Sequence, residues 1–156
     1  MAYEDLIKDD IVSMFRGELI GSGISRDVYA FDSMIPKAKR LVMKIEREDS
    51  GHFANVLEYK IWCIVRKTKW AKWFAPCVAL SESGRILMQA RTEPVSESSQ
   101  WPDEMPAFLG DTKVNNYGVY KGRVVCHDYG LDSVLAMIFN GKGPKMKSVE
   151  WMVPNG

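Results

Sequence analysis

Apolar and polar positions alternate in several short stretches of the first ninety residues. Such alternation is typical of half-buried strands, whereas an apolar repeat at every third or fourth position is typical of an amphipathic helix. Strands are therefore predicted in "GELIGSG" (17–23), "RDVYAF" (26–31) and "LVMKIERE" (41–48). The stretch "CVALSESGRILMQARTEPV" (77–95) predicts two more strands, joined by a tight turn at Ser83-Gly84.

One long stretch, "SGHFANVLEYKIWCIVRKT" (50–68), has the strongest helical pattern in the chain. Phe53, Val56 and Ile61 follow helical spacing, and Ser50 or Gly51 is expected to begin the helix. A shorter amphipathic helix is predicted over residues 3–15, followed further along by a polar turn at 33–40. The first half of the chain is thus expected to be rich in strands, with one long helix.

The second half has a weaker pattern. The polar segment 96–106 predicts a linker or lid with little structure of its own, and "YGVYKG" and "RVVCH" predict two short strands around a turn at Lys121-Gly122. A helix is predicted in "LDSVLAMIFN" (131–140), a solvated turn in "GKGPKMK" (141–147) and an exposed apolar tail in "VEWMV" (149–153). Together these elements predict an α+β fold.

Composition narrows the class of protein. With 156 residues, 46% hydrophobic residues and a net charge of +1, the chain is expected to be one soluble domain with no strong attraction to nucleic acid. The apolar runs are too short to span a membrane, and no secretory signal is expected. Three separated cysteines and two histidines do not suggest a disulfide framework or a zinc site. We therefore expect a cytoplasmic protein whose "KWAKWF" (69–74) aromatics pack into the core.

Several polar residues stand at positions where chemistry is possible, although each has an ordinary structural explanation when taken alone. Gly21 and Gly23 would suit a hairpin turn, Lys44 an exposed strand position and Glu58 a solvated helix face. Likewise, "GDTKVNN" (110–116) would suit a polar loop, and "CHDYG" (126–130) the end of a strand followed by a turn. The order and spacing of the whole set matter more than any one member.

This ordered set resembles the protein-kinase-like superfamily, from about residue 17 to residue 130. The matching features are a glycine-rich hairpin, a strand lysine, a helix glutamate, an Asp-x-Lys-x-x-Asn loop and an Asp-Tyr-Gly turn. The stretches "AKWFAP" and "QARTEP" are also similar to small kinase-like proteins of bacteriophages, which would place the protein in the host cytoplasm.

For the nucleotide, the resemblance implies a binding surface on the first ninety residues. Backbone N–H groups at Gly21 and Gly23 would approach the phosphates, and Val28 would cover one face of the adenine. Lys44 would contribute positive charge to the phosphates, held in place by an ion pair with Glu58. The connector between the two lobes would follow, and backbone groups from Gln89 to Arg91 would meet the adenine edge.

For phosphoryl transfer, the resemblance implies a second group of residues. Asp111 would accept the proton of an attacking hydroxyl, and Lys113 would lie near the transferred phosphoryl group. Asn116 and Asp128 would bind Mg²⁺, because it prefers hard oxygen ligands. The implied cofactors are therefore ATP and Mg²⁺.

The sequence also departs from the family pattern. Arg26 replaces the third glycine of the loop, where it is expected either to reach a phosphate or to close the loop. A glycine rather than His-Arg precedes Asp111, which resembles the small-molecule branch of aminoglycoside and choline kinases. Only nineteen residues (92–110) separate Arg91 from Asp111, and 26 (131–156) follow Gly130. We thus expect one kinase-like domain, with a near-complete N-terminal lobe (1–90) and a strongly reduced C-terminal lobe (91–156).

Three hypotheses remain open. The first is a minimal phosphotransferase that uses ATP and Mg²⁺, with Asp111 as base. The presence of all five polar residues of the pattern favours it: Lys44, Glu58, Asp111, Asn116 and Asp128. The second is a weak or inactive kinase-like module, a pseudokinase, that binds a host protein or a second copy of itself through surface left by the missing helices. The third is a small α+β domain whose motifs coincide by chance.

Overall fold

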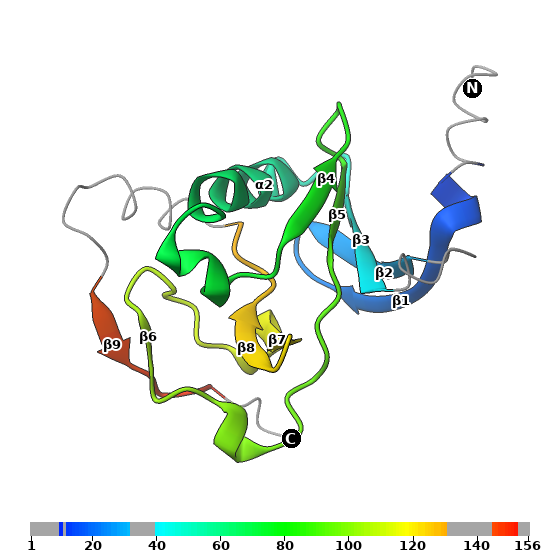
Figure 1. The fold of residues 1–156 in the computed structure, drawn as a ribbon. Coiled ribbons are helices and arrows are strands. Elements are labelled where there is room, and N and C mark those ends of the chain that lie inside the picture. The colour runs from blue at the N-terminus through cyan, green and yellow to red at the C-terminus, as the bar shows by residue number, and fades with distance from the viewer. Residues whose placement is uncertain (1–9, 11, 32–39, 131–144, 153–156) are drawn as a thin grey trace.

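A five-stranded antiparallel sheet forms the first part of the molecule (Figure 1). The computed structural model describes residues 10, 12–31, 40–130 and 145–152. The strands lie in the order β1 (Arg16–Ser22), β2 (Arg26–Phe31), β3 (Leu41–Glu46), β5 (Ile86–Ala90) and β4 (Cys77–Leu80). All five predicted strands are confirmed, as is the turn between β4 and β5.

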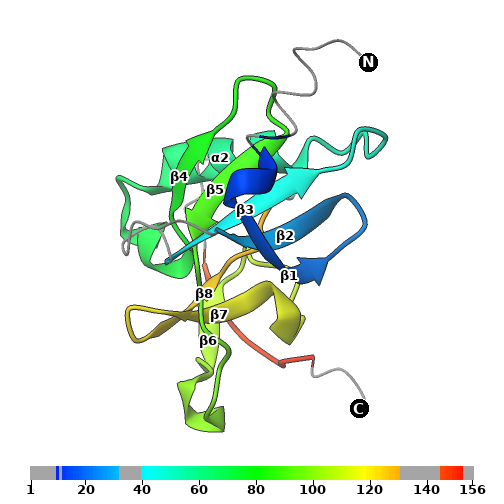
Figure 2. The ribbon, with the colours of Figure 1, turned by 90° about the vertical axis from the view of Figure 1, so that its right-hand side faces the viewer.

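The helix α2 (Ala54–Val65) packs on one face of the sheet against β3, β4 and β5, and it lies behind the strands in Figure 2. Its predicted start at Ser50 or Gly51 is wrong. Phe53 has a left-handed backbone (φ 53°), and its side chain is 66% exposed, so the helix begins only at Ala54. The carboxylate of Glu46 accepts the Ala54 N–H, which satisfies a donor that a helix start leaves free.

The buried face of α2 includes two polar side chains. Ile61 and Val65 are buried as in an ordinary amphipathic helix, but Asn55 and Glu58 are also fully buried. Polar groups are buried at this depth only when hydrogen bonds or opposite charges compensate them. The helix therefore packs through a polar patch, and its partners on the sheet define the candidate site.

The second part of the molecule is small. β7 (Tyr117–Tyr120) and β8 (Arg123–Cys126) form the predicted hairpin, whose turn has positive φ at Lys121 and Gly122. This hairpin lies below the sheet and α2 in both views (Figures 1 and 2). Backbone hydrogen bonds join it to the first part, from Ala75 N–H to the Cys126 carbonyl (2.8 Å) and in both directions between Glu93 and Val119.

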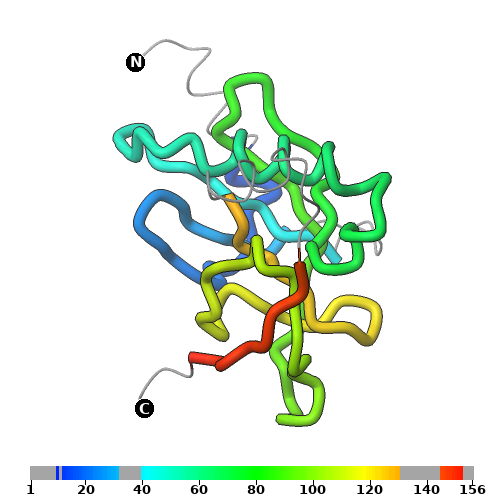
Figure 3. Tube along the Cα trace, turned by 90° about the vertical axis from the view of Figure 1, so that its left-hand side faces the viewer, coloured from blue at the N-terminus to red at the C-terminus, as the bar shows by residue number. Residues whose placement is uncertain are grey.

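Segment 96–106 is more ordered than its polar sequence predicts. It contains a short 3-10 helix (Ser98–Gln100) and β6 (Glu104–Pro106), which pairs with β9 (Met146–Ser148) from the far end of the chain (Figure 3). The prediction that 96–106 has little structure of its own is therefore wrong. Of the solvated turn predicted at 141–147, residues 146–147 lie in β9 instead, and residues 141–144 lie outside the described residues. Met105 is fully buried, so the segment contributes to the core.

The apolar tail is also less exposed than predicted. Trp151 packs on Trp101 (4.4 Å between ring centroids) and on Tyr117 (4.8 Å), and its indole N–H donates to the Pro102 carbonyl. Among its described apolar residues, Val149 and Trp151 are half-buried and Met152 is 52% exposed. The tail is therefore partly packed on the small second part.

Aromatic residues fill the core between the two parts. Phe74 stacks on Phe108 (5.7 Å) and contacts Tyr129 edge-on (4.8 Å), and all three are buried. The prediction that the aromatics of residues 69–74 pack inward is confirmed, since Trp73 is buried as well.

The α+β class is confirmed, with one long helix in the described part and a small second part. No helix among the described residues could cross a membrane. Residues 12–15 are helical, as predicted; the remainder of the 3–15 helix, apart from Asp10, lies outside the described residues, as do the helix at 131–140 and most of the turn at 33–40.

Candidate functional site

The glycine hairpin between β1 and β2 leaves open space at Gly21, and a Cβ at Gly23 would make only an ordinary contact with the Arg26 carbonyl oxygen (3.8 Å). Gly21 pairs with Val28, and the Gly23 N–H donates to the Arg26 carbonyl at 2.9 Å. Neither glycine has a positive φ, and a Cβ added at Gly21 would meet no atom within 4 Å. The hairpin does not itself require glycine at these positions, so the space above them is free for a group from outside the chain.

The hairpin tip is held by one cation. Arg47 donates to the carbonyls of Gly23 (2.8 Å) and Ile24 (2.7 Å) and pairs with the Asp27 carboxylate (2.7 Å). Asp27 also accepts the Ser22 hydroxyl, and this bond and the pair with Arg47 lower its pKa. These contacts fix the tip close to the end of β3, which limits how far the hairpin could move toward a ligand.

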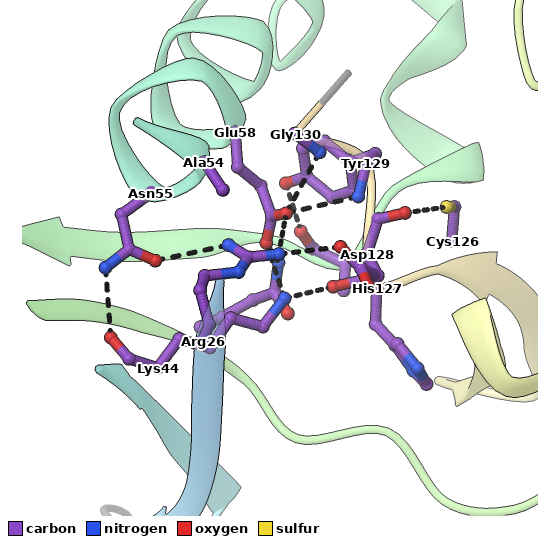
Figure 4. A network of polar contacts seen from close by, with 12 residues as sticks. Arg26, Lys44, Ala54, Asn55, Glu58, Cys126, His127, Asp128, Tyr129 and Gly130 are labelled. Carbon is purple, nitrogen blue, oxygen red and sulfur yellow. Dashed lines mark hydrogen bonds and ion pairs between the residues drawn. The ribbon is translucent and has the colours of Figure 1, made fainter. Parts of the chain in front are cut away.

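Lys44 and Glu58 lie together in one network of polar contacts, as Figure 4 shows. Lys44 projects from β3 and Glu58 from α2, and the Nζ–Oε1 distance is 2.5 Å. Both side chains are buried, and Nζ also donates to the carbonyl of His127. The structure thus brings together two residues that the motif pattern paired, and joins them to the segment carrying Asp128.

Glu58 is the centre of a larger buried network. Its two oxygens accept hydrogen bonds from the side chains of Lys44, Arg26 and Gln89 and from the backbone N–H groups of Tyr129 and Gly130. Burial opposes ionisation of Glu58, but the Arg26 and Lys44 cations outweigh it and lower its pKa to about 2. Glu58 is therefore a carboxylate at neutral pH.

Arg26 is the residue that sequence reasoning misplaced. Its guanidinium is buried (6% exposed) and bonds to Asn55 (3.1 Å), Glu58 (2.8 Å) and Asp128 (2.6 Å). The expectation left two alternatives, a phosphate contact or closure of the loop, and neither includes this interior position. The alternation of β2 could have predicted this position. Arg26 and Val28 share one face of the strand, and Val28 stands opposite Lys44 on β3, so Arg26 and Lys44 lie on the same face of the sheet.

Asp128 lies at the edge of the network. Its side chain is 55% exposed, and Oδ1 accepts the Arg26 hydrogen bond. The ring of the neighbouring His127 contacts the Thr92 hydroxyl and the Asn115 carbonyl, both at 2.7 Å. The backbone N–H of His127 donates to the Asn116 carbonyl. Burial and the nearby Lys44 charge lower the pKa of His127, so a neutral imidazole fixes the 115–116 loop beside Asp128.

Asp111 reaches the same place from the loop before β7. Its Oδ1 accepts the Lys113 N–H at 3.1 Å, and its carbonyl accepts the Tyr117 hydroxyl at 2.9 Å. Asp111 and Asp128 both line one shallow hollow, whose other members are Leu109, Gly110, Tyr117, Cys126 and Tyr129. The predicted base and the predicted metal ligand therefore line the same small hollow, whereas Lys113 is exposed and Asn116 half-buried.

The predicted adenine contacts fit less directly. The Gln89 side chain is fully buried and donates to Glu58 at 2.9 Å, a structural contact that the sequence does not predict. The Ala90 N–H donates to the Pro76 carbonyl, and the Arg91 N–H donates to the Arg40 carbonyl at 2.7 Å. Two backbone donors of the connector are therefore used within the chain, and an adenine contact there stays a prediction.

No protein-family model and no curated protein sequence matches this chain. Among solved structures, it is similar to APH(2″)-IIa in its ternary complex with streptomycin and ATP, at 16% identity and a TM-score of 0.42. The similarity covers 62% of this chain and 30% of that chain, so the present chain spans less than a third of that protein.

The five-stranded sheet, the helix carrying Glu58 and the small second part agree with the predicted kinase-like fold with a reduced C-terminal lobe.

Proposed function

We propose that this protein binds a nucleoside triphosphate in the manner of kinase-like proteins and transfers a phosphoryl group to a hydroxyl, with Asp111 as base. The observation that carries the proposal is the meeting of Lys44, Glu58 and Asp128 in one network, although they come from three separate segments. A chance combination of motifs would not require these side chains to converge.

Binding of the nucleotide rests on a fixed positive charge next to open backbone. Glu58 holds the Lys44 ammonium at 2.5 Å, so little side-chain freedom is lost when a phosphate binds. The open space at Gly21 allows phosphate oxygens to approach the hairpin backbone. Val28, between Gly21 and Lys44 in the strand register, offers an apolar surface for the base.

The transfer step assigns the proton to Asp111. The acceptor hydroxyl oxygen forms a bond to the terminal phosphorus, the bond to the bridging oxygen breaks, and the nucleoside diphosphate leaves. The hydroxyl proton passes to the carboxylate of Asp111, a residue that lines the same hollow as Asp128. Lys113 adds positive charge on the same loop.

Mg²⁺ fits the described site poorly. Asn116 and Asp128 have suitable oxygen atoms, but Asp128 Oδ1 already accepts a hydrogen bond from Arg26 at 2.6 Å. In the part of the chain that the structure describes, no group of three or more His, Cys, Asp and Glu side chains could hold a metal. The proposal therefore includes the nucleotide and derives no step through Mg²⁺.

A second candidate function is a kinase-like binding module without transfer activity. The pairing of Arg26 with Asp128 favours it, because that carboxylate is then occupied by a residue of the chain itself. The short connection between Arg91 and Asp111 favours it too, since it leaves little chain for an acceptor site. Such a module would act through a protein partner, either a host protein or a second copy.

The test is a titration of ATP with fluorescence or calorimetric detection, followed by a transfer assay on a panel of hydroxyl compounds. Lys44→Met is expected to weaken binding at least tenfold, or about 1.4 kcal/mol. Its fold is expected to persist because Glu58 keeps Arg26 as a partner. Asp111→Asn is expected to bind ATP normally and lose transfer.

The matched control is Arg85→Gln, which removes a cation from an exposed pair with Glu48. Unchanged ATP affinity in Lys44→Met would refute the proposed binding site. Normal binding without transfer in the wild type would favour the second candidate.

A further inference from the structure

We infer that Arg26 takes the place of a divalent cation at Asp128, so that this protein binds its nucleotide without a metal ion. This inference rests on the proposed nucleotide binding and concerns the chemistry of the same site. It starts from the contact that Figure 4 shows at its centre, the guanidinium of Arg26 between Glu58 and Asp128.

The position of Arg26 is built into the fold. Nη1 donates to Asn55 Oδ1 at 3.1 Å, and the Asn55 amide donates in turn to the carbonyls of Lys44 (3.1 Å) and Arg85 (2.8 Å). Asn55 is fully buried, and its amide orientation is fixed by those two backbone oxygens. Arg26 is therefore held by a chain of buried contacts, unlike a surface side chain that moves freely.

The charges of the network are already balanced. Two cations, Arg26 and Lys44, face two carboxylates, Glu58 and Asp128. The same Nη2 atom lies 2.8 Å from Glu58 and 2.6 Å from Asp128, so one guanidinium bridges both carboxylates. A divalent cation at Asp128 would have to break this bridge or stand next to a buried positive charge, and both are unfavourable.

The bridge also ties three parts of the molecule together. Arg26 begins β2 directly after the glycine hairpin, Glu58 lies on α2, and Asp128 follows β8. A metal ion in a nucleotide site commonly joins the phosphates to the protein. Here the guanidinium of Arg26, at the start of β2, supplies the fixed positive charge.

The experiment compares ATP affinity in excess EDTA with affinity in excess MgCl₂, using calorimetry on the full chain. In the wild type we expect the two dissociation constants to agree within about threefold, which is well under 1.4 kcal/mol. Asp128→Asn, a change at a half-exposed side chain, is expected to leave their ratio unchanged. Arg85→Gln, which removes a cation from an exposed pair, serves as the charge-matched control for Arg26→Gln.

Arg26→Gln is expected to behave differently. Removal of the guanidinium frees the Asp128 carboxylate, so Mg²⁺ should strengthen ATP binding by about tenfold or more. The double variant Arg26→Gln with Asp128→Asn should lose that dependence, which isolates the coupling between the two residues. Arg26→Lys keeps the positive charge, so its ATP affinity in EDTA should again be close to its ATP affinity in MgCl₂. A thermal melt with circular dichroism verifies that each variant is folded.

A second arm uses Mn²⁺ alone as the probe, with paramagnetic resonance of the free ion as the readout. Wild type is expected not to bind it at Asp128, and Arg26→Gln is expected to bind it in an Asp128-dependent manner. Binding of Mn²⁺ by the wild type that Asp128→Asn abolishes would overturn the inference.

The remaining outcomes separate the inference from the proposed function. ATP binding by the wild type only in MgCl₂, lost in Asp128→Asn, would overturn the inference and leave nucleotide binding standing. An Arg26→Gln variant that is folded and binds ATP equally well in EDTA and MgCl₂ would also overturn it, since Arg26 would then be a structural clasp alone. Failure to bind ATP under either condition would refute the proposed function, and the inference with it.

Discussion

Replacing Glu58 by Gln removes the carboxylate that Arg26 and Lys44 share while keeping the shape of the side chain. Glu58 is fully buried and accepts hydrogen bonds from both cations. Lowering its pKa from 4.5 to about 2 corresponds to about 3 kcal/mol in favour of the folded carboxylate. Removing one partner of a buried ion pair typically costs about 3–5 kcal/mol, since the other charge is left unpaired.

We therefore expect Glu58→Gln to lower the free energy of unfolding by about 3 kcal/mol or more, measured by urea denaturation. The matched control is Glu48→Gln, the same change in the exposed pair with Arg85, where the side chains are 82% and 45% exposed. An exposed pair contributes about 0–1 kcal/mol, so the control should differ little from wild type. A loss below about 1 kcal/mol in Glu58→Gln would refute the buried charge network.

The same group makes a prediction about pH. Because the folded state lowers the pKa of Glu58, its stabilisation is fully present above the unfolded pKa and is lost as pH falls toward about 2. The unfolding free energy of the wild type should therefore decrease between about pH 4.5 and pH 2. Glu58→Gln should lack this component, and an identical acid profile in both proteins would contradict the assignment.

Three further predictions follow from burial and packing. Gly21→Ala should change stability by less than about 0.5 kcal/mol, because a Cβ there meets nothing within 4 Å, but should weaken ATP binding in the titration above. Met105→Ala should cost about 2–5 kcal/mol in urea denaturation, since Met105 is fully buried; a smaller loss would show that segment 96–106 is not part of the core. Cys63 is exposed, whereas burial raises the pKa of the Cys77 thiol to about 12 and also raises the pKa of the Cys126 thiol. Ellman's reagent should therefore modify one thiol in the native protein and three in urea.

The sheet and the convergence of the polar residues could be predicted because the signals are local. Strand alternation and turn residues lie within a few positions of each other, and they located the five strands of the main sheet and the β7–β8 hairpin. The motif order also paired Lys44 with Glu58, which the ion pair bears out.

Other features depend on contacts between distant segments, which no local pattern contains. β6 pairs with β9 across about forty residues, so the polar sequence of 96–106 predicted a linker in its place. The start of α2 is set by the Glu46 carboxylate on β3, and this moved it past Ser50 and Gly51 to Ala54.

The interior position of Arg26 changes what the retained polar residues mean. A glycine at this position would leave Asp128 without its cation and Glu58 with Lys44 alone. Arg26 supplies that cation, and the two carboxylates neutralise the buried positive charges of Arg26 and Lys44. The charge network by itself therefore accounts for the positions of Glu58 and Asp128. Asp111 has no cation partner among the described contacts and lines the small hollow, so the proposed transfer step depends on Asp111, whereas the proposed nucleotide binding depends on the network of Lys44, Glu58 and Asp128.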